Sequence, residues 1–170
     1  MIANFWINIY TNAYMHKKEF FKSILKKVTI FAGIDEKGID RIYSECRIVK
    51  KKAGEVIIRE GSDATDIYII LKGKVQIVLS VDNRPFELLE LGAGNCVGEA
   101  SVIGIQKHCA SVSILEDAAL MVLSGKVLMD IYAEDKEVFS LLILNIAREL
   151  ARRLYRTDQI LLKCSLHTTA

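Results

Sequence analysis

The chain has 170 residues, of which 51% are apolar and 26% are charged, so it suits one folded domain and excludes a disordered or collagen-like chain. Its net charge of +2 is too small to argue for nucleic-acid binding by itself. The charge is unevenly spread, because residues 16–30 and 145–163 carry +4 and +3 whereas residues 31–144 carry −5. A mildly acidic central module is poorly suited to bind the phosphate backbone of nucleic acids.

The first 15 residues form an extension without any charged side chain. Asn4, Asn8 and Asn12 interrupt its apolar residues and no positive charge precedes them, so the pattern does not fit a signal peptide. The segment is also too short to span a bilayer as a helix. We expect a weakly ordered or helix-packed extension, and the alternatives are that it lies on a membrane surface or against a partner.

Four cysteines show no C-x-x-C spacing, which argues against zinc-ribbon, iron–sulfur and thioredoxin-like sites. They stand at Cys46, Cys96, Cys109 and Cys164. Together with the lack of a signal peptide, this predicts reduced thiols, buried as small apolar side chains, in a cytoplasmic protein.

Residues 16–45 are expected to form short helices that cover one end of the domain. Between residues 16 and 29, apolar residues recur at helical spacing with lysines opposite them. Asp35 is a good N-cap for a second helix, whose apolar face contains Ile39, Ile42 and Tyr43.

Residues 46–124 have the texture of a small all-β sandwich or barrel. Short segments rich in Val and Ile, among them DIYIIL, KVQIVLSV, ASVSILE and AALMVLS, alternate with turn signals. The turns are marked by Asp82-Asn83, which reads as a hairpin tip, and by Gly54, Gly61, Gly73, Gly92 and Gly94. The expected fold class is therefore mainly β with flanking helices, a β-roll of jelly-roll type.

Residues 125–163 are expected to be helical again. Ser124 can cap a short helix, and residues 136–163 contain no Gly or Pro and predict one long helix. Along it, a seam of coiled-coil type is formed by Ile143, Ala147, Leu150, Leu154, Thr157 and Leu161. A second apolar face, formed by Val138, Phe139, Leu142 and Ile146, suits packing on the chain's own β-roll. A helix with two apolar faces serves two surfaces, so we predict a homodimer through residues 140–163, with residues 164–170 as a tail.

One stretch carries candidate binding chemistry, the run Gly98-Glu99-Ala100-Ser101 between a strand and a short helix. A glycine there lets backbone N–H groups close on an anion. The carboxylate of Glu99 can accept hydrogen bonds from sugar hydroxyls, and Ser101 adds a hydroxyl group. Together these residues could hold a ribose and a phosphate.

In this arrangement the chain resembles the cyclic nucleotide-binding domain family, in particular the sensor half of catabolite activator proteins and their relatives. The resemblance covers about residues 20–163. It rests on GEVIIREGSDATDIYIILKGKV (54–75), on the Gly98–Ser101 run, and on Ala151-Arg152-Arg153-Leu154 followed by Thr157-Asp158.

The resemblance implies a role for each matching residue. Glu99 would bind the ribose 2′-hydroxyl, and amides near Ala100 and Ser101, with Cys109 or Ala110, would bind the cyclic phosphate. Arg153, Thr157 and Asp158 would lie near the purine or the dimer seam.

One departure concerns the phosphate. The family's arginine should fall at position 108 or 109, where this chain has His108 and Cys109. Loss of a bidentate arginine–phosphate pair costs ~1.5–3 kcal/mol. Lys107 could supply a point charge, and His108 could donate a hydrogen bond when protonated at slightly acid pH. Equally, both residues could simply decorate an exposed loop.

Three functions therefore stay open. The favoured one is a stand-alone regulatory or sensor domain that binds cAMP or cGMP and signals through its C-terminal helix to an unknown effector. The alternatives are a degenerate dimerisation or docking module without nucleotide, and a sensor of another small anion.

Other activities are not expected. Only six residues follow Cys164, too few for a winged helix-turn-helix, so specific DNA binding by this chain alone is not predicted. No nucleophile–base or metal constellation emerges, so we expect no enzymatic activity, no metal and no required cofactor.

Overall fold

The structure, a computed structural model, describes residues 23–81 and 84–168. In chain order the elements are η1 (Thr29–Phe31), α2 (Glu36–Glu45), β1 (Arg47–Lys51), β2 (Val56–Ile58), β3 (Asp66–Val81), β4 (Arg84–Gly92), β5 (Cys96–Val97), α3 (Glu99–Ile103), β6 (Ser111–Ser124), α4 (Gly125–Glu134) and α5 (Lys136–Thr168). The predictions for residues 1–15, for most of the first helix, and for the hairpin tip at 82–83 lie outside the described residues.

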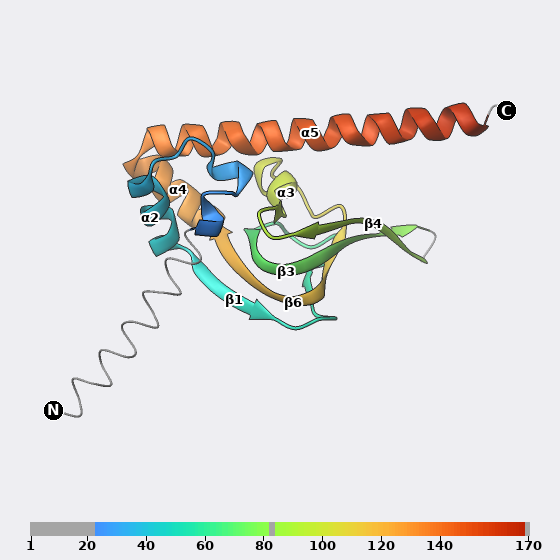
Figure 1. Cartoon of the computed structure of the whole chain (residues 1–170), viewed down its shortest axis with the longest axis horizontal. Helices are drawn as coiled ribbons and strands as arrows, with labels where there is room; N and C mark the ends of the chain where they lie inside the picture. The colour runs from blue at the N-terminus through green and yellow to red at the C-terminus, as the bar shows by residue number, and fades with distance from the viewer. Residues whose placement is uncertain (1–22, 82–83, 169–170) are drawn as a thin grey trace, which may run out of the picture.

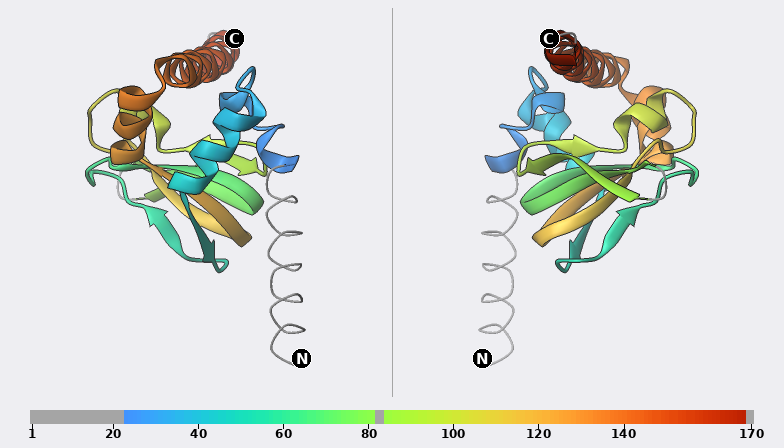
Figure 2. Two further views of the ribbon diagram at one scale, coloured as in Figure 1. Left: turned by 90° about the vertical axis from the view of Figure 1, so that its left-hand side faces the viewer. Right: turned by 90° about the vertical axis from the view of Figure 1, so that its right-hand side faces the viewer.

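The strands form one antiparallel sheet that curves into a roll (Figure 1). Its main order is β1-β6-β3-β4, while β2 adds to β6 and β5 adds to β3. Figure 2 shows α2, α4 and α5 gathered on one side of this sheet. The predicted fold class, a β-roll with flanking helices and a long C-terminal helix, is confirmed.

Gly73 does not end a strand, and here the sequence reading was wrong. β3 runs through it without interruption, and the two predicted segments after residue 110 likewise merge into β6. Gly73 has φ +86°, and a Cβ atom there would lie 2.5 Å from the carbonyl oxygen of Asp117. The pairing between β3 and β6 shifts register around this position. Gly73 therefore permits a bend within β3 at a point where β3 and β6 approach closely. This bend is found in place of the predicted turn.

Two apolar clusters stabilise the fold. One lies inside the roll and includes Ile58, Ile70, Val75, Val112, Ile114 and Leu120. The other joins the sheet to the helices and includes Leu25, Ile30, Ile42, Ile67, Met121, Leu123 and Ile131. From α5, Val138, Leu142 and Ile146 enter this second cluster, so the predicted face that packs on the chain's own roll is confirmed.

The predicted helix caps at Asp35 and Ser124 are also confirmed. The Asp35 carboxylate accepts a hydrogen bond from the backbone N–H of Gly38 at 2.8 Å. The Ser124 hydroxyl accepts one from the N–H of Val127 at 3.3 Å. Each satisfies an amide that the first helical turn leaves without an intrahelical partner.

α5 is one continuous helix and continues to Thr168, past the predicted end at residue 163. No glycine or proline stands at 164–168 to stop it, so the predicted tail is helical over those residues. Among the described residues, no helix combines the length and apolar character that crossing a bilayer requires.

The seam on α5 is divided between the core and the surface. Leu150 is half-buried and packs against the cluster shared with the sheet, whereas Ala147 is exposed and Leu154 is 63% exposed. The side chain of Leu161 lies outside the description. Part of the predicted seam therefore serves the domain's own core, and its C-terminal part faces outward.

The described cysteines are free but differ in exposure. Cys96 is buried, as predicted, and Cys46 is half-buried, with a pKa that burial raises to about 12. Cys109 is exposed, so the expectation of burial was wrong for this residue. It lies at the surface, in the segment between α3 and β6.

Candidate functional site

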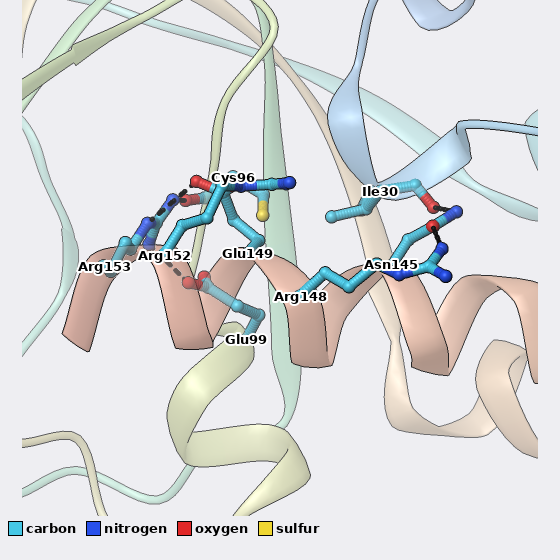
Figure 3. Close-up of polar contacts among 8 residues, drawn as sticks. All are labelled: Ile30, Cys96, Glu99, Asn145, Arg148, Glu149, Arg152 and Arg153. Carbon is cyan, nitrogen blue, oxygen red and sulfur yellow. Dashed lines mark hydrogen bonds and ion pairs between the residues drawn. The ribbon is translucent and has the colours of Figure 1, made fainter. Parts of the chain in front are cut away.

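Gly98 forms the tight turn between β5 and α3. Its φ of +88° lies in the left-handed region, and a Cβ atom there would lie 2.7 Å from the carbonyl oxygen of Asp66. A side chain at this position would thus be both strained and in collision with backbone. The turn places Glu99 at the first position of α3, facing α5 (Figure 3).

Glu99 and Arg153 form a buried ion pair that joins α3 to α5. Glu99 is only 1% exposed, and its Oε1 atom accepts a hydrogen bond from Nη1 of Arg153. The other terminal nitrogen of Arg153, Nη2, donates to the carbonyl oxygen of Cys96 at 2.8 Å. The second carboxylate oxygen, Oε2 of Glu99, is buried and makes no hydrogen bond within the described part of the chain.

Glu149, one helical turn before Arg153, completes this group. Its Oε1 lies 3.4 Å from Nε of Arg153, and its Oε2 accepts from Nη2 of Arg152 at 2.8 Å. All three guanidinium nitrogens of Arg153 therefore have a partner, on Glu99, on the Cys96 carbonyl and on Glu149. We call Glu99, Glu149, Arg152 and Arg153 the α3–α5 ion-pair group.

The two carboxylates of this group are unequally compensated. Burial raises the pKa of Glu99, and the opposing effect of Arg153 does not cancel it. Burial also acts on Glu149, but the hydrogen bond from Arg152 and the charges of both arginines together lower its pKa. Glu99 thus has one oxygen, Oε2, without a hydrogen-bond donor, whereas Glu149 has an arginine at each of its oxygens.

His108 lies on the other side of the Gly98 turn, where it lines a cavity of about 280 Å³. Arg59, Ser62, Asp66 and Tyr68 are among the other residues around this cavity, and Glu99 is not. Burial lowers the pKa of His108, because a buried imidazole is less readily charged than one in water. The sequence-based expectation that His108 is protonated at slightly acid pH stays a prediction, and this pKa shift opposes it.

The remaining predicted site residues are less closely grouped. Ser101 is buried in α3, whereas Ala100 and Cys109 are exposed and Ala110 is half-buried. Lys107 is exposed, with its Nζ 3.7 Å from Asp63. Thr157 and Asp158 are exposed, and the Thr157 hydroxyl donates to the carbonyl oxygen of Arg153 at 3.1 Å.

The structure therefore brings Gly98, Glu99 and Arg153 together and leaves Lys107 and Thr157 at the surface. Two residues near the site were missed from the sequence. Glu149 carried a signal, because it stands four residues before Arg153, the spacing of a helical ion pair. Arg59 carried none, since its position near His108 depends on the fold. Within residues 23–81 and 84–168, no group of His, Cys, Asp and Glu side chains suits a metal ion.

Comparison with known proteins shows the family of this chain. Residues 48–135 match the family described as cyclic nucleotide-binding domain. The chain is 27% identical over 136 residues to the CRP-like cAMP-activated global transcriptional regulator of Mycobacterium tuberculosis, covering 79% of this chain and 59% of the relative. It is 29% identical over 139 residues to the bovine cyclic nucleotide-gated channel beta-1, covering 80% and 10%. The chain thus spans less than two thirds of either relative.

Solved structures have the same fold. The catabolite activator protein of Thermus thermophilus superimposes with a TM-score of 0.71 at 25% identity, covering 81% of this chain and 63% of that one. A cyclic nucleotide-binding domain from Methylobacillus flagellatus gives a TM-score of 0.76 at 21% identity, covering 85% and 84%.

Proposed function

Because the chain belongs to the cyclic nucleotide-binding domain family, we propose that it is a regulatory domain that binds cAMP or cGMP at the Gly98–Ser101 turn and signals through α5. The observation that carries this proposal is the unpartnered Oε2 of Glu99. A buried carboxylate oxygen without a donor is costly, so the site is complete only when a ligand supplies one.

A ribose 2′-hydroxyl is a donor of the required kind. It can donate to Oε2 while Arg153 keeps its bond to Oε1, so the ion pair and the ligand need not compete. The cyclic phosphate would meet backbone amides near Ala100 and Ser101, with Cys109 or Ala110, as in the family. Burial lowers the pKa of His108, so a histidine here matches the phosphate charge less fully than an arginine, and we expect modest affinity.

We propose that ligand binding is signalled through α5, because Arg153 of this helix contacts Glu99 directly. Glu99 is 1% exposed, so a ligand that reaches it must displace part of what covers it, and α5 contacts it directly. A shift of α5 would then reach the exposed side chains at its C-terminal half, among them Leu154. In this proposal α5 also joins two copies through residues 140–163, in the cytoplasm, and presents the signal to an effector not yet identified.

Calorimetric titration of the purified chain with cAMP and with cGMP tests the proposal. We expect binding of one of them, and Glu99→Gln, which keeps the side-chain volume, should weaken it ten- to a hundredfold, the loss typical of a charge-assisted hydrogen bond. Glu137→Gln, an exposed glutamate in the first turn of α5, is the matched control and should bind normally. No binding of either nucleotide at millimolar concentration would overturn the proposal.

The cavity beside His108 favours a second candidate, a sensor of another small anion. Arg59 and His108 both line it, although Asp63 and Asp66 do so too and reduce its positive charge. Binding of inorganic phosphate that Arg59→Gln abolishes and Glu99→Gln leaves intact would support this candidate. If neither nucleotide nor phosphate binds, the dimerisation or docking module remains.

A further inference from the structure

Arg153 is in position to close on both oxygens of Glu99, yet it bonds only one of them. Arginine and carboxylate groups commonly pair through two parallel hydrogen bonds, because the guanidinium fork matches the two oxygens. Here the guanidinium cannot turn to do so, since Nη2 is held by the Cys96 carbonyl at 2.8 Å and Nε faces Glu149 at 3.4 Å.

We propose that Glu149 is a positioning residue that keeps Arg153 on a single oxygen of Glu99 and so leaves Oε2 free for a ligand hydroxyl. This inference rests on the proposed function for the nature of that hydroxyl, but its geometric part concerns the ligand-free chain. Glu149 acts through Arg153 and does not itself touch the ligand.

Burial and charge make Glu149 suited to this role. It is 8% exposed, and Arg152 holds its Oε2, so its side chain is fixed and its other oxygen points to Nε of Arg153 (Figure 3). The two arginines lower the pKa of Glu149 despite its burial, so it remains a carboxylate when Glu99 begins to take up a proton. Arg153 therefore has a permanent second anion on its own helix.

Removing the acceptor at position 149 should release Nε of Arg153. Only the Cys96 carbonyl would then oppose a rotation of Arg153 onto both oxygens of Glu99. That rotation should be favoured, because charge-assisted hydrogen bonds to a carboxylate are stronger than one to a neutral carbonyl. Oε2 of Glu99 would then accept a hydrogen bond from Arg153, and a ligand would lose the contact that its 2′-hydroxyl makes with this oxygen. The effect should thus be confined to ligands that carry this hydroxyl.

The test compares cAMP with 2′-deoxy-cAMP by calorimetry. The natural chain should prefer cAMP about tenfold or more, the value of one hydrogen bond to a charged group. Glu149→Met, which keeps the side-chain length without an acceptor, should reduce this preference to about onefold while binding of 2′-deoxy-cAMP stays unchanged. Glu149→Gln should restore most of the preference, because its amide oxygen can still accept from Nε. Glu137→Met, on the same helix and away from the group, should leave the preference intact.

A preference that survives in Glu149→Met would overturn the role of Glu149 and leave the proposed function standing. If the natural chain binds neither nucleotide, the proposed function fails, and the geometry is tested without ligand. A crystal structure of Glu149→Met should then show Arg153 bonded to both oxygens of Glu99, and a single bond would overturn the inference. Should Glu149→Met not fold, Glu149→Ala serves the same comparisons.

Discussion

The side-chain nitrogen of Asn145 in α5 donates a hydrogen bond of 2.7 Å to the carbonyl oxygen of Ala32, which follows η1. The same nitrogen reaches the carbonyl oxygen of Ile30 at 3.3 Å, and Asn145 is 4% exposed. Asn145→Ala should lower the free energy of unfolding by about 1–3 kcal/mol, because it leaves buried acceptors without a donor. Urea denaturation measures this loss. Arg148 also donates a hydrogen bond to Asn145, but its own side chain is exposed, so Arg148→Ala should lower the free energy of unfolding by less. Equal losses for the two variants would contradict the expectation.

The Gly98 turn can be tested against a glycine of the same conformation. Gly54 also has φ +88°, but a Cβ atom there would meet nothing within 4 Å. Gly54→Ala should therefore cost only the left-handed strain, about 1–2 kcal/mol. Gly98→Ala adds the collision with the Asp66 carbonyl and should cost roughly 1–3 kcal/mol more. Thermal unfolding of both variants measures the difference, and similar losses would show that the turn has room for a side chain.

Nucleotide binding should weaken as the pH falls. Burial raises the pKa of Glu99, so its carboxylate takes up a proton at a higher pH than an ordinary glutamate and then ceases to be a charged acceptor. His108 does not compensate, because burial lowers its pKa. Calorimetry from about pH 7.5 to about pH 5 should show this decline, and Glu99→Gln should abolish it. Affinity that instead rises toward low pH would assign the titrating group to His108.

Self-association should depend on the outward part of the α5 seam. Leu154 is 63% exposed, so Leu154→Glu should place a charge in the predicted dimer interface without disturbing the domain's core. Sedimentation velocity should then give a monomer for Leu154→Glu and a dimer for the natural chain. Gln159→Glu, at another exposed position of α5 that lies off the seam, is the control. A natural chain that sediments as a monomer contradicts the homodimer.

Local signals account for what could be predicted from the sequence. The caps at Asp35 and Ser124 each depend on a hydrogen bond to a backbone amide three residues away, and α5 depends on an unbroken helical pattern. Both features can therefore be predicted from a short stretch of sequence. Glu99 was identified because its neighbours form a recognisable run.

Features that depend on distant partners could not be predicted. Gly73 reads as a turn until Asp117 is brought against it, and His108 reads as a loop residue until the Gly98 turn packs beside it. Asn145 and Glu149 are polar residues on a helix, which by pattern belong to a solvated face. The burial of Asn145 beside η1 and of Glu149 beside the Glu99–Arg153 pair depends on the fold, so it could not be predicted. Only the pairing of Glu149 with Arg153 had a signal in the sequence, its helical spacing.

Because α5 is one continuous helix that is anchored in the core, a tilt about the anchored part moves its far end the most. Asn145 and Ile146 anchor it in the core, Arg153 contacts Glu99 and the Cys96 carbonyl two turns later, and the helix runs on to Thr168. At about 1.5 Å per residue, the helix from Ile146 to Thr168 is roughly 33 Å long. A tilt of about 5° about Ile146 would carry its far end about 3 Å sideways, which exceeds the shifts of about 1–2 Å by which helices switch protein interfaces. Small rearrangements at one carboxylate are thereby enlarged at the end of the helix.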